Sequence, residues 1–234
     1  MTTHPEHHRV SAVLLLAILS CAAPATTSRG TAAAPPVNTA ETAVASDAAA
    51  DSLLADVHAL DPTIVVEMRY ATANNFTGAP LPGYLANRAF LRREAAQALV
   101  RVQRRLRSEG LGVKIFDAYR PVRATLAMVE WTGKVNRPDL LADGYIASRS
   151  RHNLGLAIDL TLIDLASGGE LEMGTPFDTF SAAAHTANAS GEAAVNRQKL
   201  KRAMEAEGFV NYDQEWWHFS FDLPAPLRFD RVIQ

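Results

Sequence analysis

Apolar residues recur at the spacing of an amphipathic helix in two parts of the chain. In residues 92–107, arginine and glutamate occupy one face, and the apolar face consists of Ala95, Ala96, Leu99, Val102 and Leu106. Residues 196–207 show a similar pattern, and a glycine follows each segment as a stop signal. We therefore predict helices over both segments, and a third from Pro121, which suits a first helical turn, to about Trp131.

Short apolar runs predict strands between these helices. Residues 64–68 are rich in β-branched side chains and follow a turn, and residues 113–116 form a second run. Residues 158–163 are apolar on both sides, which predicts a central strand with Asp159 at its start. Residues 74–83 contain two glycines and two prolines and are expected to form a loop.

The order of these elements indicates the fold class. Strands and helices do not alternate regularly, and no internal repeat is visible. This order favours an α+β domain over a doubly wound parallel sheet. We expect one domain with a mostly antiparallel sheet packed by helices.

The N-terminal part has the pattern of an exported protein. Arg9 precedes an apolar run, residues 10–19, whose length is that of a signal peptide rather than of a membrane-spanning helix. Residues 18–21, Ile-Leu-Ser-Cys, resemble a bacterial lipobox, in which Cys21 would receive a lipid. The alternative is an ordinary secretory signal in which Cys21 is coincidental.

The next segment is expected to be a linker. Residues 22–51 are dominated by Ala, Thr, Pro and Ser and contain almost no large apolar side chain, so burial cannot offset the entropy of ordering. We therefore expect a signal peptide over 1–21, a disordered linker over 22–51 and the folded domain over 52–234.

Composition narrows the classes of function. Of 234 residues, 48% are hydrophobic and 21% are charged, as in an ordinary globular protein. The net charge of −2 gives no basic surface for phosphate groups, so we expect no nucleic-acid partner. The single cysteine excludes an internal disulfide.

Two distant segments carry residues that suit a metal site. His152 and Asp159 lie seven positions apart, and Glu215 precedes His218 by three. A catalytic zinc needs three protein ligands, an open position and a nearby base, and these four residues could supply the ligands and the base. A lone histidine is more often structural, so the prediction depends on the joint pattern.

Arg120 is a further candidate. It follows the strand predicted at 113–116 and precedes Pro121, so it should lie in a turn, where binding groups tend to collect. A guanidinium there could stabilise an oxyanion or bind a carboxylate. The alternative is a surface salt bridge.

These motifs together resemble a known group of enzymes. The pattern S-x-H-x-x-G-x-A-x-D from Ser150, followed by E-x-W-H from Glu215, resembles the zinc D,D-peptidase superfamily, which includes carboxypeptidases and Hedgehog-like domains. Residues 69–78, 117–121 and 215–218 resemble more specifically the D-alanyl-D-alanine dipeptidases. The resemblance extends from about Leu60 to Asp222.

The resemblance implies roles for individual residues. One Zn²⁺ per chain would be bound by His152, Asp159 and His218, with Glu215 as general base and Arg120 stabilising the tetrahedral intermediate. Ser150 would bind the substrate carboxylate, while Tyr70 and Asp178 would surround the free amine. Residues 181–195 are rich in alanine and small polar residues, which leaves the part that covers the substrate least defined.

The function implied is hydrolysis of D-alanyl-D-alanine and similar short dipeptides, with a role in cell-wall turnover. The expected location is the periplasm or cell envelope, with membrane contact only through the lipid at Cys21. Two alternatives remain open: a D,D- or L,D-carboxypeptidase that acts on peptidoglycan stem peptides, and a non-catalytic wall-binding lipoprotein.

Overall fold

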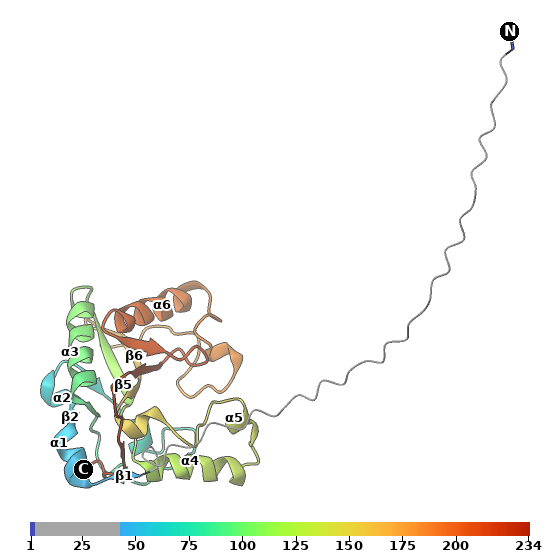
Figure 1. Cartoon of the computed structure of the whole chain (residues 1–234). Helices are drawn as coiled ribbons and strands as arrows, with labels where there is room; N and C mark the ends of the chain where they lie inside the picture. The colour runs from blue at the N-terminus through green and yellow to red at the C-terminus, as the bar shows by residue number, and fades with distance from the viewer. Residues whose placement is uncertain (3–42) are drawn as a thin grey trace, which may run out of the picture. The chain divides into compact units, whose positions relative to one another are not determined.

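The computed structural model describes residues 1–2 and 43–234 (Figure 1). The predicted signal peptide, the lipid site at Cys21 and the linker up to residue 42 lie outside the described residues. Ordered structure begins before the predicted boundary at Ser52, with β1 (Val44–Ala45) and α1 (Asp47–Leu53). Ser46 caps α1 by accepting a hydrogen bond from the Ala49 amide, and Ala50 is buried. Capping and burial of small side chains therefore order residues that were predicted as linker.

The centre of the domain is a five-stranded sheet of order β3-β5-β6-β8-β7. Its strands are β3 (Val65–Val66), β5 (Leu111–Asp117), β6 (Ala157–Asp164), β7 (Phe209–Asn211) and β8 (His218–Phe221). Only the β3–β5 pair is parallel, and the other three pairs are antiparallel. The predicted α+β fold with a mostly antiparallel sheet is confirmed, and β6 is its central strand.

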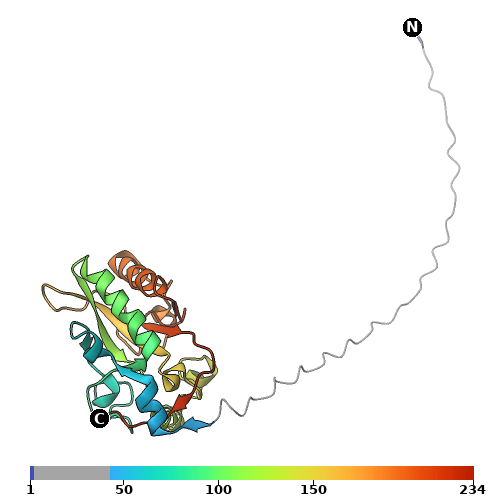
Figure 2. The same ribbon diagram turned by 60° about the vertical axis from the view of Figure 1, so that its left-hand side comes forward.

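Two long helices cover one face of this sheet. They are α3 (Arg93–Arg107) and α6 (Gly191–Glu205), which lie side by side in Figure 2. Helix α3 packs on β5, and α6 packs on β6 and β7. Their buried faces, which include Leu99 and Leu200, join the main hydrophobic core.

Shorter elements surround the sheet. Strand β2 (Leu54–Asp56) pairs antiparallel with β4 (Phe90–Arg92), and β1 pairs parallel with β9 (Arg228–Phe229). The remaining elements are α2 (Val57–Leu60), α4 (Val122–Lys134), α5 (Asp139–Ala142) and the 3₁₀ turns η2 (Arg69–Ala71), η3 (Arg151–Leu154) and η4 (Ala182–Ala184). Within the described part of the chain, no helix has the length and apolarity needed to cross a bilayer.

Most of the predicted elements are present; several bounds shift by up to three residues, and two elements differ most clearly. The strand predicted over 64–68 shortens to β3 because the Met68 amide donates to the Asn87 side chain and leaves the sheet. Helix α6 starts at Gly191 rather than Asn196, since the preceding residues include two alanines, the strongest helix former. The predicted loop over 74–83 contains neither helix nor strand.

Candidate active site

Three neighbouring strands bring the first polar residues of the site together. Asp117 on β5 lies opposite Asp159 on β6, and Asp159 lies opposite His218 on β8. Between Ile115 and Asp117 the register shifts, because two residues of β5 there advance the pairing by a single residue of β6. This is a β-bulge, and it turns Asp117 to the sheet face of Asp159 instead of the face of Ile115.

A short turn before β6 positions His152. Its Nδ1 lies 2.6 Å from the Ala118 carbonyl oxygen. A carbonyl can only accept, so Nδ1 donates and Nε2 keeps its lone pair for a metal. The turn ends at Gly155 with φ +64°, where an added Cβ would lie 2.6 Å from a methyl carbon of Leu54. Glycine is therefore required to hold His152 in this position.

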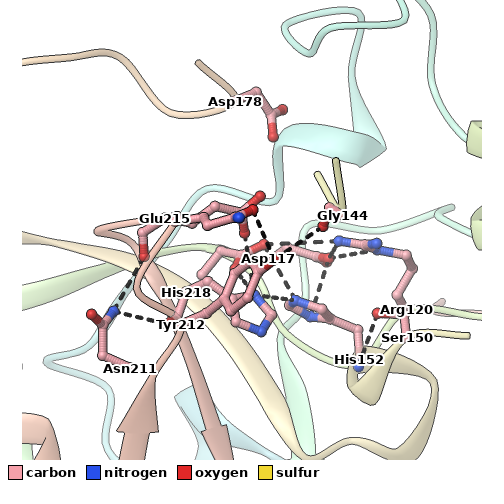
Figure 3. Close-up of polar contacts among 12 residues, drawn as sticks. Asp117, Arg120, Gly144, Ser150, His152, Asp178, Asn211, Tyr212, Glu215 and His218 are labelled. Atoms are coloured by element: carbon pink, nitrogen blue, oxygen red, sulfur yellow. Dashed lines mark hydrogen bonds and ion pairs between the residues drawn. The ribbon is translucent and has the colours of Figure 1, made fainter. Parts of the chain in front are cut away.

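The three predicted metal ligands form one cluster, shown in part in Figure 3. His152 Nε2 lies 3.2 Å from His218 Nδ1 and 3.4 Å from Asp159 Oδ2, and His218 Nδ1 lies 2.9 Å from Asp159 Oδ1. A tetrahedral zinc with bonds of about 2.0 to 2.1 Å sets its donor atoms roughly 3.3 Å apart. The nitrogen and oxygen donors of this chain therefore fit such an ion.

Charge favours the ionised form of the ligand carboxylate. Burial opposes ionisation of Asp159, but the charge and hydrogen bonds of His152 and His218 outweigh it and lower its pKa. Burial also lowers the pKa of His218, which keeps the ring neutral and able to coordinate. Asp159 and His218 are thus favoured in the protonation states that a metal requires.

Arg120 lies beside the metal ligands and is fixed by Asp117. Its Nε and Nη2 lie 2.9 and 2.8 Å from Asp117 Oδ2, and Nη2 is 3.8 Å from Asp159 Oδ2. The Tyr84 hydroxyl donates to the other oxygen of Asp117 at 2.6 Å. The guanidinium carbon of Arg120 also lies 5.1 Å from the centre of the Tyr70 ring. The cation is held in place and cannot swing into solvent, and the predicted alternative of a surface salt bridge is excluded by its burial.

Glu215 precedes β8 and is buried, with only 7% of its surface exposed. Its Oε2 lies 3.8 Å from His218 Nδ1, too long for a hydrogen bond. Burial, followed by the charges of Asp159 and Asp178, raises the pKa of Glu215 well above its ordinary value. A bound cation would act in the opposite direction. The carboxyl group of Glu215 lines the same cavity as the predicted metal ligands, which is the position that a general base would need.

Tyr70, Asp178 and Ser150 complete the predicted set. The Tyr70 hydroxyl donates to Asp178 Oδ1 at 3.0 Å, and Figure 3 shows Asp178 apart from the cluster of Asp117, Arg120 and His152. Ser150 is the N-cap of η3, and its oxygen accepts a hydrogen bond from the His152 amide at 3.3 Å. Its hydroxyl hydrogen remains available to a ligand.

The predicted site residues surround a common cavity of about 290 Å³. All eight residues predicted to bind metal or substrate or to act in catalysis line it: Tyr70, Arg120, Ser150, His152, Asp159, Asp178, Glu215 and His218. They come from segments far apart in the sequence, and aromatic side chains such as Phe76 and Tyr145 form further parts of the wall. Its volume is near the lower end for ligand pockets, which suits a small ligand.

The sequence prediction missed the residues that support this set. Asp117 begins the segment 117–121 that carries part of the family resemblance, but the sequence predicted no role for it. Its position three residues before Arg120 is nevertheless a signal for an ion pair. Asn211 donates from its side chain to the backbone carbonyls of Glu215 and His218 at 3.2 and 3.0 Å, and so fixes the loop between β7 and β8 (Figure 3). Nothing in the local sequence marks Asn211 for that role.

Comparisons with known proteins agree with the geometry. The family model Peptidase_M15, described as D-ala-D-ala dipeptidase, matches residues 50–231. A D-alanyl-D-alanine dipeptidase from Enterococcus faecalis is 37% identical over 176 residues, which cover 68% of this chain and 87% of the relative. One from Escherichia coli is 34% identical over 182 residues, covering 76% of this chain and 90% of the relative.

A solved structure of vancomycin resistance D,D-dipeptidase VanXYg with a D-Ala-D-Ala phosphinate analog is also similar. It is 21% identical, with a TM-score of 0.38 over 57% of this chain and 51% of that one. This likeness is too partial to support a functional argument. The family match and the curated relatives do not depend on it, and they show that the chain belongs to the M15 peptidase family of D-alanyl-D-alanine dipeptidases.

Proposed function

We propose that this protein is a zinc-dependent dipeptidase that hydrolyses D-alanyl-D-alanine and similar short dipeptides. The observation that carries the proposal is the single cavity lined by three metal-ligand side chains, a buried carboxylate and a fixed guanidinium. Membership of the dipeptidase family supports the choice of substrate. A role in cell-wall turnover is part of the same proposal, since this dipeptide is a component of peptidoglycan stems.

His152, Asp159 and His218 would hold the zinc. A bound Zn²⁺ supplies Lewis-acid chemistry, because it lowers the pKa of water and polarises a carbonyl oxygen. Glu215 takes a proton from the attacking water, since its carboxylate faces the cavity and burial raises its affinity for protons. The same carboxyl group then gives that proton to the departing amine.

Arg120 acts on the charge that develops on the carbonyl oxygen. Its guanidinium is already oriented by Asp117, so it does not have to reorganise when the oxyanion forms. Removal of one such donor typically lowers kcat by about 10²- to 10³-fold. Arg120 therefore acts in catalysis, and Asp117 positions Arg120.

The two ends of a dipeptide suit opposite parts of the cavity. Asp178, with Tyr70 beside it, provides a carboxyl group whose ionised form would pair with the ammonium group, and Ser150 provides a hydroxyl donor for the carboxylate. A longer peptide would place an uncharged amide beside Asp178 and leave that carboxylate without its partner. Recognition of both charges therefore selects short substrates.

The test is turnover of D-alanyl-D-alanine by the purified protein, followed by release of free D-alanine. We expect activity that a chelator removes and added zinc restores, and a much lower rate on a pentapeptide ending in the same dipeptide. Glu215→Ala should lower kcat by about 10²- to 10⁴-fold while the zinc content stays at one per chain. Absence of zinc-dependent turnover would refute the proposal, and preference for the pentapeptide would favour the carboxypeptidase alternative.

We further propose that the protein is exported and attached to the cell envelope by a lipid at Cys21. The apolar run before Cys21 and the lipobox-like residues support this, and they lie outside the described part of the structure. Intact-mass measurement of the protein purified from membranes should give a chain that begins at Cys21 and carries the mass of the lipid. A chain processed elsewhere, without added mass, would indicate the ordinary secretory signal instead.

A further inference from the structure

Three arginines line the cavity, and two of them already have partners. Arg120 is held by Asp117. Arg151 donates from Nη2 to the Phe221 carbonyl oxygen at 2.6 Å and forms an ion pair with Asp222. The third, Arg149, is exposed, and within residues 43–234 it has neither a hydrogen-bond nor an ion-pair partner. It is therefore the cation of this cavity that remains available to a ligand.

The carboxylate end of a dipeptide needs more donors than Ser150 offers. An ionised carboxylate accepts through two oxygens, whereas a serine hydroxyl donates a single hydrogen. The other polar groups that line the cavity include the acidic side chains of Asp159, Asp178 and Glu215, which supply no positive charge for a substrate carboxylate. A second, positively charged donor near Ser150 would balance both the hydrogen bonds and the charge.

We propose that Arg149 binds the substrate's C-terminal carboxylate together with Ser150, and so determines the preference for a free acid at that end. The inference rests on the proposed dipeptidase function. Arg149 directly precedes Ser150 in the chain, and both residues line the same cavity. Its guanidinium can give two parallel hydrogen bonds to a carboxylate, a geometry that a lysine cannot reproduce.

This arrangement also separates the roles of the arginines. Arg120 is buried beside the metal ligands and acts on the reacting carbonyl, whereas Arg149 lies at the exposed edge of the cavity. A contact made equally in the ground state and the transition state changes KM and leaves kcat unaltered. Loss of Arg149 should therefore appear in KM, and loss of Arg120 in kcat.

The experiment compares two substrates that differ only at the carboxyl end, D-alanyl-D-alanine and its C-terminal amide, in the full-length zinc-loaded protein. For Arg149→Gln we expect kcat/KM on the free acid to fall about 10- to 100-fold, through KM, as for a lost charge-assisted hydrogen bond. On the amide the change should stay within about twofold, because no charge is lost there. Arg149→Lys should recover part of the loss on the acid.

Arg104→Gln is the matched control, because Arg104 is also exposed and without an ion-pair partner in the described residues, but lies on α3. Arg104→Gln should leave kcat/KM unchanged on both the acid and the amide. Equal losses on acid and amide in Arg149→Gln would indicate a structural role for Arg149, and no loss on either would show that it does not touch the substrate. Both outcomes overturn the inference.

A binding measurement separates this inference from the proposed function. Calorimetric titration of zinc-loaded Glu215→Ala with D-alanyl-D-alanine, with and without Arg149→Gln, gives the affinity without any turnover. If the wild type hydrolyses nothing but Arg149→Gln still weakens binding of the acid and not of the amide, the inference holds and the hydrolase proposal fails. If the substitution leaves the affinity for the acid unchanged, the inference fails whatever the activity.

Discussion

The two faces of the central sheet are buried against different surroundings. One face lies under α3 and α6, and its residues Val113, Ile115, Leu160 and Leu162 are fully buried and apolar. The opposite face holds Asp117, Asp159 and His218, together with the buried Thr161, and its Asp159 and His218 line the cavity. Adjacent residues of β6 belong to opposite faces, because successive side chains of a strand alternate.

This difference separates stability from activity along one strand. Burial of apolar side chains on the helix-covered face contributes free energy to folding, whereas a buried carboxylate or imidazole costs free energy unless it is paired. The polar face therefore depends on its internal contacts, and a metal held by His152, Asp159 and His218 would add to them. A substitution on the apolar face of β6 should therefore lower stability and leave activity unchanged. A substitution at the neighbouring position on the polar face should lower activity and leave the fold intact.

The largest expected effect is on the polar face. Asp159→Asn keeps the size of the side chain but removes the charge that binds the metal and pairs with His152 and His218. We expect zinc affinity to fall at least about 100-fold, more than for residues that only orient a ligand, and turnover to fall with it. Competition with a chelating dye and a turnover assay measure the two quantities.

Cooperative unfolding of Asp159→Asn should persist, as followed by circular dichroism. Unchanged zinc affinity in this variant would show that Asp159 is not a ligand and would remove the distinction between the two faces.

Substitution of the next residue, Leu160, should lower stability and leave activity nearly unchanged. Leu160→Ala leaves a cavity under the helices and should lower the free energy of unfolding by about 2 to 5 kcal/mol, since Leu160 is fully buried. In the cold, where the variant remains folded, kcat should stay within about threefold of the wild type, because the chemistry lies on the other face. Denaturant titration gives the stability, and a kcat that falls in proportion to it would contradict the separation.

The smallest expected effect is a pH dependence at Asp178. Burial, followed by the charge of Asp159, raises the pKa of this carboxyl well above its ordinary value. The folded chain then keeps a proton that the unfolded chain has lost, so stability falls as pH rises from about 3.9 toward the raised pKa. Asn cannot titrate but still accepts from Tyr70.

Asp178→Asn should therefore remove this fall and raise the Tm of the metal-free protein at neutral pH by about 2 to 4 °C. Scanning calorimetry across the acid range measures it. Asp164→Asn is the control, because hydrogen bonds from Ser167 lower the pKa of Asp164 and its substitution cannot give a gain of the same sign. Parallel curves for the wild type and Asp178→Asn would show that burial of this carboxyl does not matter.

Much of the site was predictable because its residues lie in compact motifs. Only the end of one turn and the start of one strand separate His152 from Asp159, so two residues that are close in the sequence are also close in space. Glu215 and His218 are likewise joined by a short loop. Such local patterns carry chemical information without any knowledge of the fold.

The supporting contacts were not predictable, since they depend on strand register. The role of Asp117 follows from a β-bulge, and no local feature of residues 113–116 distinguishes a bulged strand from a regular one. The contact between Tyr70 and Asp178 depends on the loop that follows β6, which brings together two residues far apart in the sequence. The start of α6 and the order in residues 43–51 were missed because capping and packing outweighed composition there.

The strand order has a consequence for the timing of assembly. β8, which carries His218, the last of the predicted metal ligands, lies between β6 and β7, although β7 precedes it in the chain. The nascent chain therefore cannot complete the site until the hairpin of β7 and β8 has joined β6. A ribosome-bound chain that ends before Glu215 has His152 and Asp159 but lacks both Glu215 and His218, the third predicted ligand. We therefore expect peptidase activity to begin only after the hairpin of β7 and β8 has joined β6, which would keep the unfinished chain inert during synthesis.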